Sequence, residues 1–203
     1  MKLEADTLYH IYNQGNNRQQ IFFSNEDYLA FLKLYRKHVA DYCETLSYCL
    51  MPNHFHFIVY TNHKSVEQKK LGSINIQLLS DGFRKLSSAY AQETNLRRRA
   101  SGSLFRQKTK AKDLSVTLFN KYFSYAELCF FYIHQNPIDG GLVKNVTDWN
   151  FSSAKDYAGI RNGTLCNREL AFKLFEWDTE DVSFFKQQYA IDKKAMDSFW
   201  AKK

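Results

Sequence analysis

Two histidines, His54 and His56, stand two positions apart within the apolar stretch "CLMPNHFHFIV" of residues 49–59. Because side chains alternate across a β-strand, both imidazoles would lie on one face with Ile58, while the phenylalanines and Val59 would face the core. The two rings would then be about 6–7 Å apart along the strand, close enough to reach one cation. Neutral imidazole is a common metal ligand. The pair is therefore a candidate metal site, although two such histidines can also simply line a polar sheet face.

A second pair of chemically capable side chains, Tyr132 and Asn136, occurs in "YIHQNP" further along the chain. They are four positions apart on a predicted helix and would share one helix face. Asn136 offers a carbonyl oxygen that suits a hard cation such as magnesium, and two histidines leave room for such a third ligand. Tyr132 offers a phenol that can act as a covalent nucleophile. From the residues alone, Tyr132 could equally be a core aromatic and Asn136 the end of a helix.

A basic segment between residues 97 and 112 contains no acidic residue. Its last four basic residues alternate with other residues, so a strand over 104–112 would place them in a cationic row that suits a phosphate backbone. Lysines also protect the exposed edges of sheets, and the polar loop "NQGNNRQ" could be a plain solvent loop. The candidate nucleic-acid contacts are Asn16, Asn17, Arg18, Arg84, Lys85, Arg97, Arg98, Arg99, Arg106, Lys108, Lys110 and Lys112.

Composition bounds the class of protein. The 203 residues are 44% hydrophobic and 16% aromatic, enough for a sizeable core and for one main domain. The net charge of +7 favours a polyanionic partner, nucleic acid before an acidic membrane surface, although a solvated basic surface would look the same. No apolar run approaches the length of a membrane span, and no secretory signal is visible, so we expect a cytoplasmic protein with no membrane partner. The four cysteines form no CxxC pair and indicate scattered reduced thiols.

The elements that must position these residues follow from periodicity and turn chemistry. Strands are predicted at 7–13, 44–50, 54–61 and 104–112, and helices at 25–42, within 73–95 and at 124–137. The first helix would be capped by Ser24 and Asp27, and the last would begin with a Ser-x-x-Glu capping box and end near Asn136, before Pro137. The order strand, helix, strand, strand, helix, strand, helix predicts an α+β fold, a ferredoxin-like antiparallel sheet with helices on one face.

The end of the chain is predicted to be a helical extension, with helices at "NRELAFKLFEW" and "DTEDVSFFKQQYA". We therefore expect residues 1–160 to form the main domain, which contains the candidate site residues, and residues 161–203 to form a C-terminal helical extension packed on it or beside it.

Several segments, taken in order, resemble one known family. "YHIYNQGNNRQQIF", "MPNHFHFIV", "SGSLFRQ", "YIHQNP" with "GLV", and "DWNFSSAKDYAG" look like the tyrosine transposases of single-strand insertion sequences, and in particular their chromosomal relatives, the REP-associated tyrosine transposases. These proteins belong to the HUH endonucleases, named for a histidine–hydrophobic–histidine motif. The resemblance covers roughly residues 7–160, and the joint occurrence of the segments is more specific than any one of them.

The resemblance implies a site and a reaction. His54 and His56 would hold a divalent metal, Mg²⁺ or Mn²⁺, with Asn136 as the third ligand. Tyr132 would attack a phosphodiester of single-stranded DNA and form a 5′-phosphotyrosyl link, as in DNA transposition and recombination. The DNA would be a hairpin of a repeated extragenic element, and the protein a monomer or a homodimer, with the tyrosine helix from either subunit.

Two departures and two alternatives accompany this interpretation. The family commonly has Arg-Gly where this chain has Gln14-Gly15, and a basic residue where it has Asp139 and Gly140; neither departure touches the expected metal ligands or nucleophile. One alternative is a domesticated descendant that binds structured single-stranded nucleic acid without cutting it. The other is a replication or conjugation initiator, which usually draws its tyrosine from a differently placed element and often carries a further domain.

Overall fold

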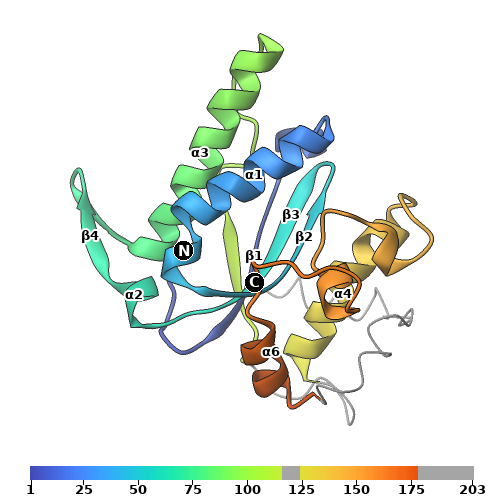
Figure 1. Ribbon diagram of the computed structural model, residues 1–203. Coiled ribbons are helices and arrows are strands. Elements are labelled where there is room, and N and C mark those ends of the chain that lie inside the picture. Colours follow the sequence, from blue (N-terminus) through green and yellow to red (C-terminus); the bar gives the residue numbers. More distant parts are fainter. Residues whose placement is uncertain (116–123, 178–203) are drawn as a thin grey trace.

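The computed structural model describes residues 1–115 and 124–177 of the chain. A four-stranded antiparallel sheet has the order β2-β3-β1-β6. Its strands are β1 (Leu8–Gln14), β2 (Glu44–Met51), β3 (His54–Tyr60) and β6 (Lys110–Asp113), and its main helices are α1 (Asn25–His38), α3 (Leu78–Arg98) and α4 (Tyr125–Asp139). The order of elements is the predicted one, and the α+β, ferredoxin-like fold class is confirmed (Figure 1).

Smaller elements fill the connections. They are α2 (His63–Val66), β4 (Gln68–Leu71), β5 (Ile74–Gln77), α5 (Ala154–Tyr157), α6 (Arg168–Phe175) and three short 3₁₀ turns, Asn16–Arg18, Ala40–Tyr42 and Val146–Asp148. The helix predicted within residues 73–95 is α3, but it begins only at Leu78, because the preceding residues form β5 in a hairpin with β4. The helix at "NRELAFKLFEW" is confirmed as α6, whereas "DTEDVSFFKQQYA" lies outside the described residues, and the division at residue 160 stays a prediction. Within the described parts of the chain, no helix is long and apolar enough to cross a membrane.

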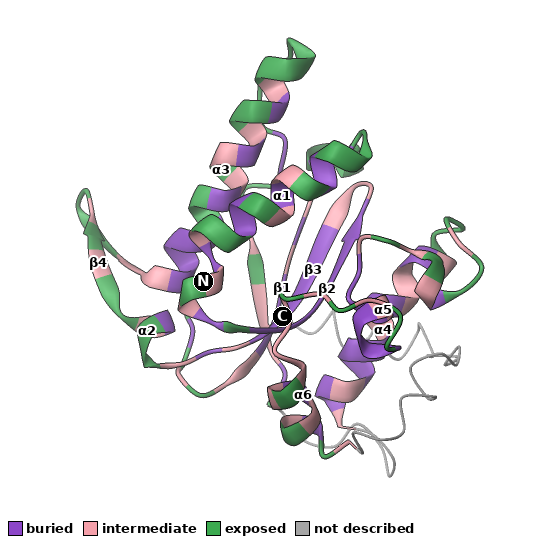
Figure 2. Cartoon of the chain, viewed as in Figure 1, coloured by how far each residue is buried: buried purple, intermediate pink, exposed green. Residues whose placement is uncertain are grey.

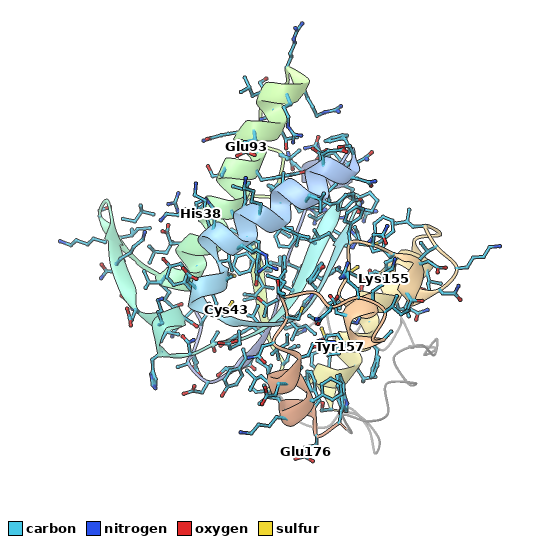
Figure 3. The ribbon with its side chains drawn as sticks, viewed as in Figure 1. His38, Cys43, Glu93, Lys155, Tyr157 and Glu176 are labelled. Atoms are coloured by element: carbon cyan, nitrogen blue, oxygen red, sulfur yellow. The ribbon has the colours of Figure 1, made fainter. Side chains whose placement is uncertain are left out.

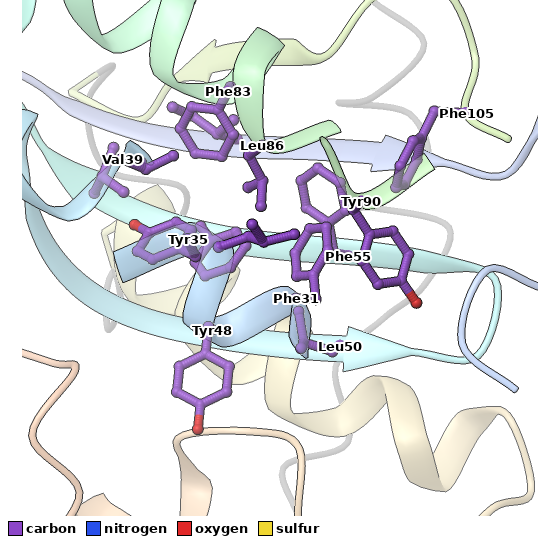
Figure 4. Packing of buried hydrophobic residues seen from close by; sticks show 14 of the residues in the cluster. Phe31, Tyr35, Val39, Tyr48, Leu50, Phe55, Phe83, Leu86, Tyr90 and Phe105 are labelled. Atoms are coloured by element: carbon purple, nitrogen blue, oxygen red, sulfur yellow. The ribbon is translucent and has the colours of Figure 1, made fainter. Parts of the chain in front are cut away.

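One face of the sheet carries an aromatic core. Phe55, Phe57 and Val59 of β3 are completely buried, and α1 and α3 cover them (Figure 4). The predicted apolar stripe of α3 is confirmed from Leu79 onward. The two helices approach closely at Gly82, where an added Cβ would lie 2.5 Å from the carbonyl oxygen of His38, so only glycine fits. The predicted capping box at the start of α1 is also present. Figure 2 shows β2 and β3 largely buried, whereas the C-terminal end of α3 is exposed.

The opposite face of the sheet carries a second core, in which α4 packs against β2. Ile58 of β3 belongs to this cluster together with Phe130 and Ile133 of α4, and Tyr157 of α5, labelled in Figure 3, packs edge-to-face on Phe130. The prediction of helices on one face of the sheet is therefore wrong for α4, which partly covers the face that holds the two histidines. α4 begins with the predicted capping box but continues past the expected end to Asp139. Pro137 is tolerated because it removes only one backbone donor in the last turn of the helix. The backbone N–H of Gly140 donates to the Asn136 carbonyl at 2.8 Å and closes this turn.

The edge strand β6 is shorter than the predicted strand 104–112. Phe105 bridges Gly15, and the regular ladder resumes only where Lys110 pairs with Tyr12. Four residues of this segment, 106–109, therefore lie opposite two residues of β1, so the segment has a bulge of two extra residues. Asn13 stabilises the bulge, since its side-chain amide donates to the Arg106 carbonyl and to the Thr109 hydroxyl, both at 3.2 Å. Bulges of this kind often re-aim side chains beside functional sites.

Candidate active site

His54 and His56 come from β3, whereas Tyr132 and Asn136 come from α4. His54 and His56 point away from the aromatic core, as predicted from the alternation, with their ring centroids 4.8 Å apart. The ring of Tyr132 meets that of His56 edge-to-face at 6.1 Å. A cavity of about 540 Å³, which we call the histidine cavity, lies between them. Its lining residues are Tyr12, Asn13, Gln14, His54, His56, Arg106, Gln107, Lys108, Lys110 and Tyr132.

Asn136 lies beside this group. Its side chain is hydrogen-bonded with His54. Its amide nitrogen donates to the backbone carbonyl of Tyr132 at 2.8 Å. This hydrogen bond holds the Asn136 side chain against the preceding turn of α4. Within residues 1–115 and 124–177 no group of three or more His, Cys, Asp or Glu side chains could hold a metal. A cation bound by the two histidines would therefore need another type of third protein ligand, and the Asn136 amide is adjacent.

Burial keeps the histidines of this site neutral. It lowers the pKa of His54 to about 4, although the hydrogen bond with Asn136 acts in the opposite direction. It also lowers the pKa of His56 well below the usual value for histidine, with smaller contributions from His54 and His10. At neutral pH both rings are in the form that can donate a lone pair to a metal.

The ring nitrogens of the two histidines differ in their partners. Nδ1 of His54 is 2.6 Å from the side-chain oxygen of Asn53, and Nδ1 of His56 is 2.8 Å from Nε2 of His10. Nε2 of His56 is buried and has no hydrogen-bond partner in the described parts of the protein. A buried polar atom without a partner is rare and costly. Because His56 lines the histidine cavity, a cation there would satisfy this atom, and the donor set fits a divalent metal.

Three of the predicted nucleic-acid contacts lie at the histidine cavity. Arg106, Lys108 and Lys110 line it, and Lys110 does so from its ladder position opposite Tyr12. A larger groove of about 1110 Å³ runs beside the same segment, between it and α3. Lys112 lines this groove together with Arg84 of α3. The predicted row of cationic side chains is therefore present, although only Lys110 and Lys112 belong to a strand.

The remaining predicted contacts lie away from the histidine cavity, and several are engaged with other side chains. Arg84 and Lys85 both form ion pairs with the buried carboxylate of Asp81, at 2.7 and 3.4 Å. Arg97 forms an ion pair with Asp27 at 2.7 Å. These three guanidinium and ammonium groups neutralise carboxylates within the fold, so part of their charge is already balanced.

The basic segment begins within a helix. Arg97 and Arg98 belong to the last turn of α3, and Arg98 lies over the ring of Phe23 at 3.6 Å. Arg99 ends the helix with a φ of 50°. The polar loop around Asn16, Asn17 and Arg18 is exposed and is a short 3₁₀ turn. Gly15 precedes it and donates to the Asn53 carbonyl at 2.8 Å, which ties the loop to the turn before His54.

Two residues of the site were not found from the sequence. His10 and Tyr12 lie on β1, where Tyr12 pairs with His56 across the sheet and stacks on His10 at 4.8 Å. Their alternation in "YHIYN" signals a shared face, but only the strand register shows that this is the face of His54 and His56. His134 is close to Tyr132 in the sequence, but it is buried on another face of α4 with Nε2 2.8 Å from the Ser153 hydroxyl.

Among the comparisons with known proteins, the comparison with solved structures gives a match. No family model matches the chain, and no curated protein sequence matches it. Among solved structures, the fold is similar to that of a REP-associated tyrosine transposase bound to a REP hairpin, with a TM-score of 0.52 and 16% sequence identity. The match covers 83% of this chain and 94% of the transposase. The two proteins therefore share a fold.

Proposed function

We propose that the protein is a divalent-metal-dependent endonuclease and strand transferase that acts on single-stranded DNA through Tyr132. The observation that carries the proposal is the convergence of His54, His56 and Tyr132 on one cavity whose wall holds three cationic side chains. A pair of metal ligands, a phenol and cations are the groups that transfer of a phosphodiester needs. We also propose that the protein belongs with the REP-associated tyrosine transposases, whose motifs its sequence resembles.

The metal would be held by neutral ligands. His54 and His56 supply ring nitrogens, and Asn136 supplies its amide oxygen. When bound, the cation contributes positive charge that stabilises the negative charge on the phosphate and on the leaving oxygen. Because none of the three protein ligands is an anion, the ion keeps its full charge for the substrate. Oxygen ligation and the hard phosphate favour Mg²⁺ or Mn²⁺.

Tyr132 would act as the nucleophile. Its phenolic oxygen attacks the phosphorus, and the bond from phosphorus to the 3′ oxygen breaks. A 5′-phosphotyrosyl link forms, the phenol loses a proton, and the released 3′-hydroxyl gains one. Attack by a 3′-hydroxyl on that link reverses the exchange and rejoins a strand. An ordinary phenol titrates near pH 10, so the phenolic proton must be removed during the attack.

The substrate would be held by charge and by shape. Arg106, Lys108 and Lys110 face the cavity and can contact the phosphate backbone on either side of the cleaved bond. The transposase of similar fold binds a REP hairpin, and we propose a hairpin of single-stranded DNA as the substrate here. Because Tyr132 and the histidines that line the cavity belong to one chain, a single subunit would suffice.

A second candidate function is binding of structured single-stranded nucleic acid without cleavage. The groove of about 1110 Å³ favours it, because Arg84, Lys112 and the hydroxyl groups of Ser80 and Ser88 line that groove without contribution from Tyr132. A strand could lie there whether or not the histidine cavity performs chemistry.

The deciding experiment uses a DNA hairpin with a single-stranded extension, labelled at its 3′ end, since the fragment downstream of the cut stays linked to the protein. With Mg²⁺ or Mn²⁺, the wild type should form a covalent adduct, and Tyr132→Phe or chelation should abolish it. Tyr60→Phe is the matched control, because Tyr60 lies at the other end of β3 from His54 and should leave the adduct intact.

Two results would count against the proposal. One is the failure of the wild type to form an adduct with either metal, and the other is an adduct that persists in Tyr132→Phe. Hairpin binding that His54→Ala and chelation leave unchanged, with no cleavage by the wild type, would instead support the non-cleaving binder.

A further inference from the structure

His10 and His56 form a buried pair of imidazoles that the sequence analysis did not connect. Nε2 of His10 lies 2.8 Å from Nδ1 of His56, and the two rings are stacked with centroids 4.9 Å apart. His10 is only 1% exposed and His56 is 7% exposed, so water does not compete freely for this hydrogen bond. The bond fixes the orientation of the His56 ring with respect to the histidine cavity.

A hydrogen bond between two neutral imidazoles has one donor and one acceptor, which gives two arrangements. In the first, His56 donates from Nδ1, and its Nε2 carries a lone pair. In the second, His10 donates from Nε2, and the proton of His56 must then sit on its own Nε2. Only the first arrangement leaves the partnerless Nε2 of His56 able to bind a cation. The position of the proton within the pair therefore decides whether His56 can be a ligand.

The Nδ1 partner of the neighbouring histidine is of a different kind. Nδ1 of His54 faces the side-chain oxygen of Asn53 at 2.6 Å, and an amide oxygen can only accept. This contact favours the proton of His54 on Nδ1. His10 can either accept or donate, so the tautomer of His56 depends on the tautomer of His10. The two candidate ligands thus differ in the partner of Nδ1. That of His54 is an acceptor, whereas that of His56 is a ring nitrogen that can either accept or donate.

We propose that His10 is a positioning residue that accepts the Nδ1 proton of His56 and thereby directs the lone pair of His56 Nε2 to the metal. This inference rests on the proposed metal site of His54 and His56. Partners that hold the second nitrogen of a metal-bound histidine commonly set both its tautomer and its orientation. His10 performs this role from β1, two positions before Tyr12.

Two variants separate the accepting role of His10 from its packing. His10→Gln can present an amide oxygen near the place of Nε2 and so still accept the proton. His10→Leu fills similar space but offers no acceptor, so His56 would move its proton to Nε2. We expect His10→Leu to bind Mn²⁺ about 10–100-fold more weakly than the wild type. His10→Gln should stay within a few-fold of the wild type, and Mn²⁺ affinity is measured by calorimetry without DNA.

The tautomer itself can be observed by NMR of protein labelled with ¹⁵N in its histidine rings. In wild-type protein with Mg²⁺, we expect the His56 proton on Nδ1 and a scalar coupling between this nitrogen and Nε2 of His10, transmitted through the hydrogen bond. His10→Leu should show the proton on Nε2. A purely structural role for His10 would change stability but would not link the location of this proton to the cation.

The outcomes separate this inference from the proposed function. A wild type that binds no Mn²⁺ refutes the metal site, and the role of His10 with it. Binding of Mn²⁺ by the wild type, with the His56 proton on Nε2 in Mg²⁺, refutes the role of His10 alone, as does a folded His10→Leu protein that binds Mn²⁺ as tightly as the wild type. If His10→Leu does not fold, the wild-type spectrum and His10→Gln still decide.

Discussion

On one face of the sheet, Phe55, Phe57 and Val59 are completely buried beneath α1 and α3. On the other face, His54 is half-buried beside a cavity of about 540 Å³, and His56 keeps one buried nitrogen without a partner among the described residues. Both sets of side chains come from the same strand, β3. The aromatic face gains stability by filling space, whereas the histidine face keeps polar atoms and open volume available for a ligand. Alternate residues of one strand thus serve different purposes.

The largest effect on stability should come from the aromatic face. Phe57 is completely buried and stacks on Tyr35 with centroids 4.1 Å apart, so Phe57→Ala should lower the free energy of unfolding by about 3–5 kcal/mol. The matched change on the other face, His54→Ala, should alter it by less than about 1 kcal/mol while removing DNA cleavage. Urea unfolding and the adduct assay measure both. Similar losses of stability in the two variants would show that the faces do not differ as described.

A smaller loss is expected where the helices of the aromatic face meet. Gly82→Ala would place a methyl group 2.5 Å from the His38 carbonyl oxygen if nothing moved. Because α1 and α3 must separate to relieve this contact, we expect a loss of about 1–3 kcal/mol in urea unfolding. Adduct formation at a temperature where the variant is folded should be retained. An increase in stability, as expected for alanine in an unconstrained helix, would contradict the close approach.

The histidine face should make stability depend on pH. Burial holds the pKa of His54 at about 4 and those of His10 and His134 at about 3, whereas an unfolded histidine titrates near 6.5. Below that value the unfolded chain takes up protons that the folded protein does not. The free energy of unfolding is therefore highest above pH 6.5 and should fall by about 1.4 kcal/mol per pH unit for each such histidine as the pH drops toward 4.

Urea unfolding at several pH values between 7.5 and 4.5 measures this dependence. His134→Gln, on α4, should reduce the slope, because it removes one of the buried rings whose pKa is lowered. A free energy of unfolding that stays flat from pH 6.5 to 5 would mean that these rings are not buried in the neutral form.

The smallest effect concerns the cations beside the histidine cavity. Lys108→Gln should remove about one phosphate contact, so the slope of log affinity against log salt for single-stranded DNA should become shallower by about 0.7. Lys37→Gln is the control, since Lys37 is exposed on α1, which covers the aromatic face. Fluorescence anisotropy over a range of salt concentrations measures both. Equal slopes for the two variants would place the DNA elsewhere.

The sequence predicts those features that depend on near neighbours in the chain. Alternation along "HFHFIVY" assigns each side chain of β3 to a face, and the Ser24–Asp27 box marks the start of α1 because both are local patterns. The shared face of Tyr132 and Asn136 likewise follows from helical spacing. The hairpin of β4 and β5 was missed because its strands have four residues each and Ile76 continues the helical stripe of α3.

Features that depend on distant residues could not be predicted in this way. The bulge that contains Arg106 and Lys108 is stabilised by the side chain of Asn13, which belongs to another strand. His10 and Tyr12 join the site only through the register of β1 against β3. A local pattern shows which face of its own strand a residue occupies, but not which residues of other strands share that face.

The central claim is that Tyr132 reacts beside His54 and His56, and the most direct measurement identifies the residue that carries the DNA. The covalent adduct formed with Mg²⁺ or Mn²⁺ can be digested and its DNA-bearing peptide identified by mass spectrometry. We predict that the 5′ phosphate is attached to the phenolic oxygen of Tyr132. Attachment to another residue, such as Tyr12 on the opposite wall of the cavity, or the absence of any DNA-linked peptide from an active preparation, would contradict the account.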